Sequence, residues 1–109
     1  MNITTEWLAG LFEGEGSIYF DKSNKQWRMK LKMTDEDVVT RFHEGAGVGK
    51  IYYEPHKTFK PTWNWVLFRK AEVKAFLLRL LPLLGNRRAC KTLDALDYFD
   101  DCYNCTAPN

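Results

Sequence analysis

The residues best suited to chemistry are two carboxylates, Glu13 and Glu15, which end an apolar run that begins at Leu8. Acidic side chains suit the first turn of a helix. In the last turn they meet the negative end of the helix dipole, at a cost of about 0.3–1 kcal/mol each when exposed. This placement predicts a compensating cation. Carboxylate oxygens are ligands that divalent metals accept, so the pair indicates a metal site.

Two glycines in the same run indicate how such a helix would be positioned. Gly10 and Gly14 are four residues apart and therefore lie on one helical face. Because glycine has no Cβ atom, a second helix could approach this face closely. Paired helices of this kind would present their terminal acids to a metal.

Size and composition limit the class of protein. The 109 residues suit one domain, residues 1–109. Because no apolar run reaches the ~18 residues of a membrane span and no signal-peptide pattern begins the chain, we expect an intracellular protein of the cytoplasm or an organelle matrix, with no membrane partner. The odd count of cysteines argues against a disulfide framework and predicts reduced thiols at Cys90, Cys102 and Cys105.

Charge is distributed unevenly, although the net charge is only +2. The segment from Lys22 to Lys32 carries cations and no acid, and Arg87, Arg88 and Lys91 form a second basic cluster. Local basic surfaces of this kind bind phosphates even when the whole chain is nearly neutral.

Four helices are predicted. The first covers about Glu6 to Gly14, with Thr4 or Thr5 as its N-cap and Gly16 as its stop signal. The others are a helix opening at 34–37 with Thr34 as a possible cap, a helix over 71–83 that Pro82 bends or ends, and a last helix over about 87–103.

Strands are predicted over 17–21, 27–33, 50–54 and 62–69. In the second, apolar residues alternate with Arg28, Lys30 and Lys32, so one face is apolar and the other cationic. The Trp27/Met29 and Trp63/Trp65 stripes are expected to be core. The order αββαββα plus a final helix predicts an α+β fold, with an antiparallel sheet and helices on one face.

The run from Leu8 to Gly16 resembles the signature of the LAGLIDADG homing endonuclease family. Five residues match it outright, Phe12 is a conservative change, Glu13 and Glu15 replace two aspartates, and Gly14 replaces a small alanine; the matches are Leu8, Ala9, Gly10, Leu11 and Gly16. The element order and the segment Pro82–Arg88, similar to a basic stretch of the family, extend the resemblance from about Thr4 to Lys91. The resemblance implies that the antiparallel sheet forms a saddle over double-stranded DNA.

The resemblance also implies residue roles. The last acid of the motif, Glu15, is the catalytic metal ligand for Mg²⁺, with Gly14 beside it. Asp35 falls on a position that orients water, and Arg87 falls on the position of a catalytic cation, for which Arg88 is the alternative. Taken alone, the two acids are also compatible with a solvated helix end; within the motif, Glu13 is an interface or structural residue.

Two sets of contacts complete the expectation. The exposed strand faces and the basic cluster would bind DNA, and the list is Tyr19, Asp21, Ser23, Arg28, Lys30, Lys32, Lys50, Tyr52, Asn64, Val66 and Arg88. The signature helix would form the dimer interface through Trp7, Gly10, Leu11, Glu13 and Gly14.

Only one signature is present, so the family logic implies a homodimer and a long, near-palindromic target. The leading hypothesis is a Mg²⁺-dependent endonuclease of intron or intein mobility that cuts both DNA strands and takes no small-molecule substrate. One alternative is a non-cleaving relative, an intron maturase or DNA-binding regulator. Another is an α+β interaction domain without nucleic acid, which predicts no salt-dependent DNA binding.

Overall fold

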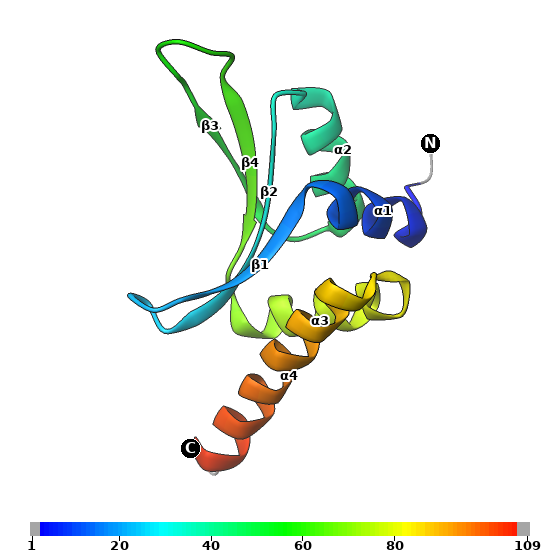
Figure 1. The fold of residues 1–109 in the computed structure, drawn as a ribbon, viewed down its shortest axis with the longest axis vertical. Helices are drawn as coiled ribbons and strands as arrows, with labels where there is room; N and C mark the ends of the chain where they lie inside the picture. The colour runs from blue at the N-terminus through cyan, green and yellow to red at the C-terminus, as the bar shows by residue number, and fades with distance from the viewer. Residues whose placement is uncertain (1–2, 107–109) are drawn as a thin grey trace.

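The computed structural model describes residues 3–106, with side chains described through residue 98. The elements follow the predicted order, with a short 3₁₀ turn added before the last helix (Figure 1). They are α1 (Thr5–Glu15), β1 (Gly16–Asp21), β2 (Gln26–Met33), α2 (Glu36–Ala46), β3 (Lys50–Glu54), β4 (Thr62–Leu67), α3 (Lys70–Leu80), η1 (Leu81–Leu83) and α4 (Asn86–Thr106).

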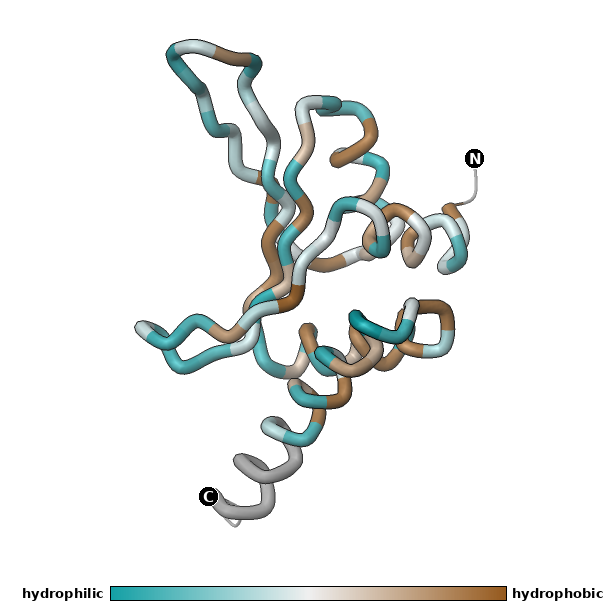
Figure 2. Tube along the Cα trace, viewed as in Figure 1, coloured by the Kyte–Doolittle hydropathy of each residue, from teal (hydrophilic) through white to brown (hydrophobic). Residues whose placement is uncertain are grey.

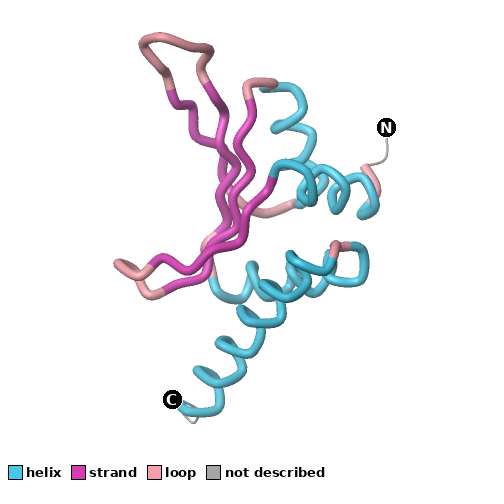
Figure 3. The backbone as a smooth tube through the Cα atoms, viewed as in Figure 1, coloured by secondary structure: helices cyan, strands magenta, loops and turns pink. Residues whose placement is uncertain are grey.

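The four strands form one antiparallel sheet in the order β1-β2-β4-β3. Figure 3 shows the sheet as one layer and the helices as a second layer on one side of it. The tips of the β1–β2 and β3–β4 hairpins bend away from the helices, so the free face of the sheet is concave (Figure 1). The predicted α+β class and the single helical layer are therefore confirmed.

Helix α1 begins with the predicted cap. The Thr4 hydroxyl accepts a hydrogen bond from the Trp7 amide at 3.1 Å, and Leu8, Ala9 and Phe12 are buried. The helix then passes directly into β1, because Gly16 has an extended backbone with φ −90°. Glycine is needed here for space and not for a left-handed turn, since a Cβ atom at this position would overlap the Phe12 ring.

Replacing Gly16 with alanine is expected to lower the free energy of unfolding by about 1–3 kcal/mol, the usual cost of overpacking a core. Gly14→Ala is the matched control, because an added Cβ there meets no atom within 4 Å in the protomer. Urea denaturation of both variants at low protein concentration measures the difference. Equal stability of the Gly16 variant and the natural chain would contradict this packing.

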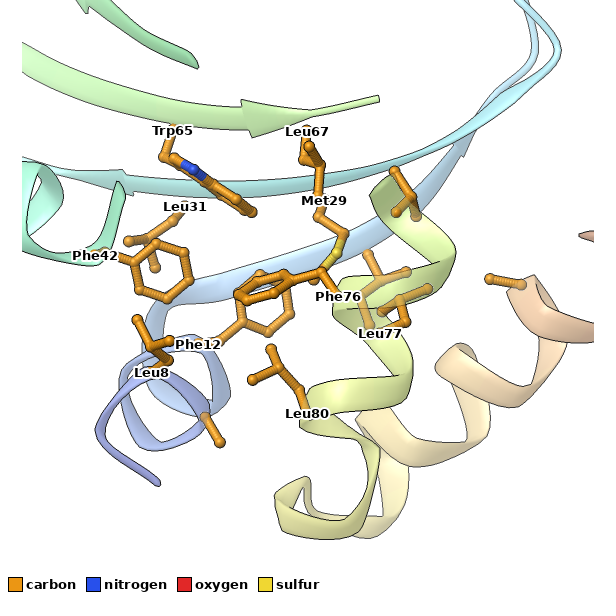
Figure 4. Close-up of a cluster of buried hydrophobic side chains, with 14 of the residues drawn as sticks. Leu8, Phe12, Met29, Leu31, Phe42, Trp65, Leu67, Phe76, Leu77 and Leu80 are labelled. Carbon is orange, nitrogen blue, oxygen red and sulfur yellow. The ribbon is translucent and has the colours of Figure 1, made fainter. Parts of the chain in front are cut away.

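The core lies between the sheet and the helices (Figure 4). The Phe42 ring packs edge-on against Trp65, with centroids 4.8 Å apart, and also contacts Phe76 and Phe12. The Trp65 indole donates a hydrogen bond to the Val48 carbonyl at 2.9 Å. Burial of the full indole ring, together with this hydrogen bond, anchors β4 beneath α2.

Two helix boundaries differ from the prediction. The N-cap of α2 is Asp35 and not Thr34, although its side chain makes no capping hydrogen bond. Helix α3 stops at Leu80, and Pro82 lies in the 3₁₀ turn that follows, because proline lacks the amide that an α-helix needs. At its other end, α2 closes with Gly47 in the left-handed region at φ 76°.

The C-terminal helix is only partly described at the level of side chains. Cys90 is a free, exposed thiol, whereas the side chains of Cys102 and Cys105 lie outside the described residues. Across the described part of the chain, none of the helices combines the length and apolarity needed to cross a membrane.

Candidate functional site

Most residues that were predicted to bind DNA from the alternating strand pattern lie on the free face of the sheet. The pairing places Lys30 opposite Val66 and Val66 opposite Lys50, which makes one cross-strand row; Lys32, Asn64 and Tyr52 make the next row. Tyr19 and Arg28 are paired further along. Figure 2 shows hydrophilic and hydrophobic residues alternating along the central strands and a hydrophilic β1–β2 turn. The concave face is therefore mostly polar, and it carries the cations Arg28, Lys30, Lys32 and Lys50.

Residues at the β1–β2 end are tied to one another. The Asp21 carboxylate accepts hydrogen bonds from the Ser23 amide at 3.0 Å and from the Asn24 side chain at 2.8 Å, and pairs with Arg28 at 3.3 Å. Arg28 also donates to Gln26 and lies 5.3 Å from the Phe68 ring centroid. Asp21 therefore closes the turn, whereas Ser23 is exposed at its tip.

A second network occupies the β3–β4 end. The Glu54 carboxylate accepts hydrogen bonds from Asn64 at 3.2 Å and Thr62 at 3.3 Å, and pairs with Lys32 at 3.3 Å. The His56 ring nitrogen lies 3.1 Å from the Thr62 hydroxyl. Sequence reasoning missed Glu54 and Thr62, although both share the face of Asn64 by alternation.

Asn64 was predicted to face DNA, but in the structure this residue is buried. It is only 5% exposed, and its side-chain carbonyl oxygen is buried without a hydrogen-bond partner among the described residues. The side-chain amide is used to hold Glu54. Contact of this amide with a base edge would therefore require its hydrogen bond to Glu54 to open.

Both networks lower the pKa of a carboxyl group. The hydrogen bond from the Asn24 side chain, supported by backbone amides and Arg28, lowers the pKa of Asp21. For Glu54, the Asn64 hydrogen bond and then Lys32 lower the pKa. A carboxyl group with a lowered pKa in the folded state stabilises the fold above its unfolded-state pKa, and that contribution disappears as pH falls through the folded-state value.

The thermal midpoint is therefore expected to fall as pH drops below about 4, the ordinary range of these carboxyl groups. Asp21→Asn and Glu54→Gln should each flatten this dependence, because the substituted group no longer binds a proton. Thermal unfolding between about pH 2 and pH 7 measures it. Glu6→Gln serves as control, since the exposed Glu6 lies outside both networks. An unchanged pH slope in both variants would contradict the assignment.

The two acids at the end of α1 have different environments. Glu13 is paired within the chain: its carboxylate accepts from the Gly85 amide at 2.5 Å and from Arg88 at 3.1 Å. Arg88 also donates to the Gly16 carbonyl at 2.5 Å. Glu15 is exposed, and its carboxylate makes no hydrogen bond or ion pair with any residue that the structure describes.

These contacts involve two of the predicted residues. Arg88 was expected to bind DNA, but its side chain is only 16% exposed and is used to hold α1. Glu13 was expected to be an interface or structural residue, and its hydrogen bonds with Gly85 and Arg88 at the start of α4 give it a structural role within the protomer. The cation that a C-terminal acid demands is therefore present for Glu13, and it is Arg88.

Of the other predicted catalytic residues, Arg87 lies close to this end of α1, and Asp35 follows the strand that pairs with β1. Arg87 is exposed and lines a pocket on the first residues of β1, together with Ser17, Arg88 and Lys91. Asp35 is exposed and follows β2, whose residue Leu31 pairs with Gly16. Arg87 therefore lies against β1, the strand that begins directly after Glu15. Asp35 lies two residues beyond the end of β2, the strand paired with β1.

The donor set at this end fits Mg²⁺. Mg²⁺ in proteins usually takes one or two carboxylates, retains several waters and binds substrate phosphates. The exposed Glu15 carboxylate and the Gly14 carbonyl are oxygen donors of this kind. Among the described residues, no group of three acidic, histidine or cysteine side chains is arranged to hold a metal ion.

The glycine face of α1 is open. Gly10 and Gly14 are exposed, and a Cβ atom added to either would meet no atom within 4 Å. Trp7 and Leu11, on the same helix, are half-buried, and Trp7 lies 5.9 Å beneath the Arg41 guanidinium. No other described segment of the protomer therefore packs closely against Gly10 and Gly14.

Comparison with known proteins identifies the fold. No protein-family profile matches the sequence, and no curated protein matches it. Solved structures match with high similarity of shape. The homing endonuclease I-CvuI, in complex with its target, superposes with a TM-score of 0.71 at 16% identity, over 95% of this chain and 70% of that chain.

Longer endonucleases match in the same way. The LAGLIDADG meganuclease I-AabMI, bound to uncleaved DNA, gives a TM-score of 0.73 at 18% identity, over 98% of this chain and 39% of that chain. The LAGLIDADG homing endonuclease I-LtrWI, bound to target DNA, gives a TM-score of 0.68 at 22% sequence identity, over 94% of this chain and 38% of that chain. The similarity of shape confirms the predicted LAGLIDADG fold.

Proposed function

We propose that this chain, which has the fold of LAGLIDADG homing endonucleases, is a site-specific DNA endonuclease that works as a homodimer with Mg²⁺. It would cut both strands of a long, near-palindromic target within the cell, in the cytoplasm or an organelle matrix, as an agent of intron or intein mobility. The observation that carries the proposal is the exposed Glu15 carboxylate at the end of α1, which has no partner among the residues that the structure describes. It stands beside a basic pocket and at the edge of a cationic sheet face.

The concave sheet face supports DNA binding. A curved β-ribbon surface can follow the major groove, and lysine or arginine side chains bind guanine edges or phosphates there. Lys30 and Lys50 flank Val66 in one row across the sheet. Neutralising several phosphates in this way would make the affinity steeply dependent on salt.

Glu15, Asp35 and Arg87 would each have a separate role in phosphodiester hydrolysis. Mg²⁺ held by Glu15 would supply Lewis-acid stabilisation of the phosphate and lower the pKa of bound water. Asp35 would orient the attacking water. Arg87, in the pocket that also contains Ser17 and Lys91, would bind the phosphate and stabilise the charge that develops on it.

Two observations support the proposed homodimer, the single exposed Glu15 in each chain and the open glycine face of α1. One Glu15 per chain serves one strand, whereas double-strand cleavage needs two such sites. Gly10 and Gly14 leave room for a second copy of α1. I-AabMI, of which this chain matches 39%, is long enough to hold two units of this size in one chain.

Selection from a randomised double-stranded DNA library tests the proposal. The purified protein should retain a near-palindromic site with an affinity that falls steeply with salt, and should cut that site when Mg²⁺ is added. Binding without cleavage would instead favour a DNA-binding regulator or an intron maturase. Binding that is absent, or independent of salt, would favour an interaction domain without nucleic acid.

A further inference from the structure

We propose that Arg88 is a positioning residue for Glu15, acting with Glu13 as a clamp on the last turn of α1. This inference rests on the proposed function, because it concerns the presentation of the catalytic carboxylate. The sequence predicted other roles for Arg88, a contact with DNA or, as the alternative to Arg87, the catalytic cation.

The contacts of the clamp lie on both sides of Glu15 in the chain. Arg88 donates one hydrogen bond to the Glu13 carboxylate at 3.1 Å and another to the Gly16 carbonyl at 2.5 Å. Glu15 itself makes no such contact with the described residues. The backbone is therefore held before and after Glu15, while its carboxylate stays free.

The start of α4 reinforces the same clamp. The Gly85 amide donates to the second Glu13 oxygen at 2.5 Å. A Cβ atom at Gly85 would lie 3.2–3.3 Å from the Glu13 carboxylate, which is tighter than an ordinary contact. The chain thus approaches Glu13 at a position where glycine leaves the most space.

Arginine suits this task for three physical reasons. The last carbonyls of a helix lack intrahelical partners, and a cation satisfies one while offsetting the negative end of the dipole. Hydrogen bonds between ionised groups are about twice as strong as neutral ones. The planar guanidinium reaches two acceptors at once in a fixed geometry, whereas the lysine head is a single point charge.

The clamp makes the geometry of Glu15 depend on α4. Loss of Arg88 would leave Glu13 and Glu15 as two uncompensated acids at the unfavourable end of α1, and would release the Gly16 carbonyl. The last helical turn would then fray, and Glu15 would sample many positions relative to the phosphate. Small misplacements of a catalytic group reduce rate strongly, up to about 10²-fold for 1 Å.

Arg88→Gln, Arg88→Lys and Glu13→Gln test the clamp, with Arg69→Gln as a matched control, because Arg69 is an exposed arginine that contacts neither Glu13 nor Gly16 in the structure. Hydrogen exchange of the Gly14, Glu15 and Gly16 amides and broadening of their resonances by Mn²⁺ give readouts without cleavage. Single-turnover cleavage and metal-free DNA affinity complete the set.

Arg88→Gln and Glu13→Gln are expected to speed exchange of these amides by about tenfold and to weaken Mn²⁺ broadening, with cleavage reduced about tenfold or more. DNA affinity and its salt dependence should stay within about twofold of the natural chain. Arg88→Lys should restore part of the protection, and it also serves as the folded variant if glutamine prevents folding.

A loss of DNA affinity in Arg88→Gln, with a shallower salt slope and unchanged exchange at Gly14–Gly16, would overturn the proposal and return Arg88 to the DNA contacts. The exchange and Mn²⁺ readouts do not depend on cleavage. If the natural chain fails to cut DNA, the proposed function fails while the clamp is still decided by these readouts.

Discussion

Glu15→Gln is expected to abolish cleavage, with the single-turnover rate reduced by roughly 10²–10³-fold or more, the range seen when one stabilising group of a transition state is removed. Glutamine keeps the length of the side chain but removes the charge that would hold Mg²⁺. Because Glu15 is exposed and unpaired within the described residues, the substitution should not disturb the fold. Cleavage of a selected target with saturating protein and Mg²⁺ measures the rate.

Glu6→Gln is the matched control for this experiment, because Glu6 is an exposed acid in the first turn of the same helix. It should cut at the natural rate. Glu15→Gln should still bind the target in the absence of metal. Full activity of the Glu15 variant would remove Glu15 from the catalytic site.

Gly10→Leu is expected to convert the proposed dimer to a folded monomer and to abolish double-strand cleavage. A Cβ atom added at position 10 meets no atom of the described residues within 4 Å, so the clash expected of a leucine is with a second copy. A leucine there would separate two helices that glycine allows to approach closely. Sedimentation velocity measures the assembly, and urea denaturation measures the fold.

Thr40→Leu provides the control for added apolar bulk on an exposed helix position, since Thr40 is exposed and lies on a different helix, α2. It should leave the assembly unchanged. An intact dimer of the Gly10 variant would show that the glycine face of α1 is not the interface.

The fold followed from local patterns. Alternation in the segment that became β2 separated Trp27, Met29 and Leu31, all buried, from the cationic residues of the other face. The glycines and prolines marked the element ends within a few residues. The prediction for the N-cap of α2 was wrong because threonine and aspartate are both good N-cap residues. The sequence does not show whether Thr34 or Asp35 is the last residue with a non-helical backbone before the helix.

The candidate site was predicted less completely, because its contacts join distant segments. The pairing of Glu13 with Arg88 spans 75 residues, and the approach of Gly85 to the same carboxylate spans 72. Alternation identified the face of Asn64 but not its burial, since that depends on Glu54 reaching across from β3. Such contacts become visible only when the strands and helices are in place.

The two acids at the end of α1, Glu13 and Glu15, have different environments in the structure. Glu13 has a cation and a backbone amide as partners and forms part of the scaffold. Glu15 has neither and remains available as a ligand. The different environments of the two acids agree with the separate roles that the resemblance implied, Glu15 as the catalytic candidate and Glu13 as an interface or structural residue.

The most direct test is the fate of a supercoiled plasmid that carries the selected near-palindromic site. The account predicts that the natural chain converts it to the linear form, with both strands cut at that site, when Mg²⁺ is present, and that Glu15→Gln binds the plasmid and leaves it supercoiled. Tight, salt-dependent binding by the natural chain with no strand cut in Mg²⁺, or equal linearisation by Glu15→Gln, would contradict it.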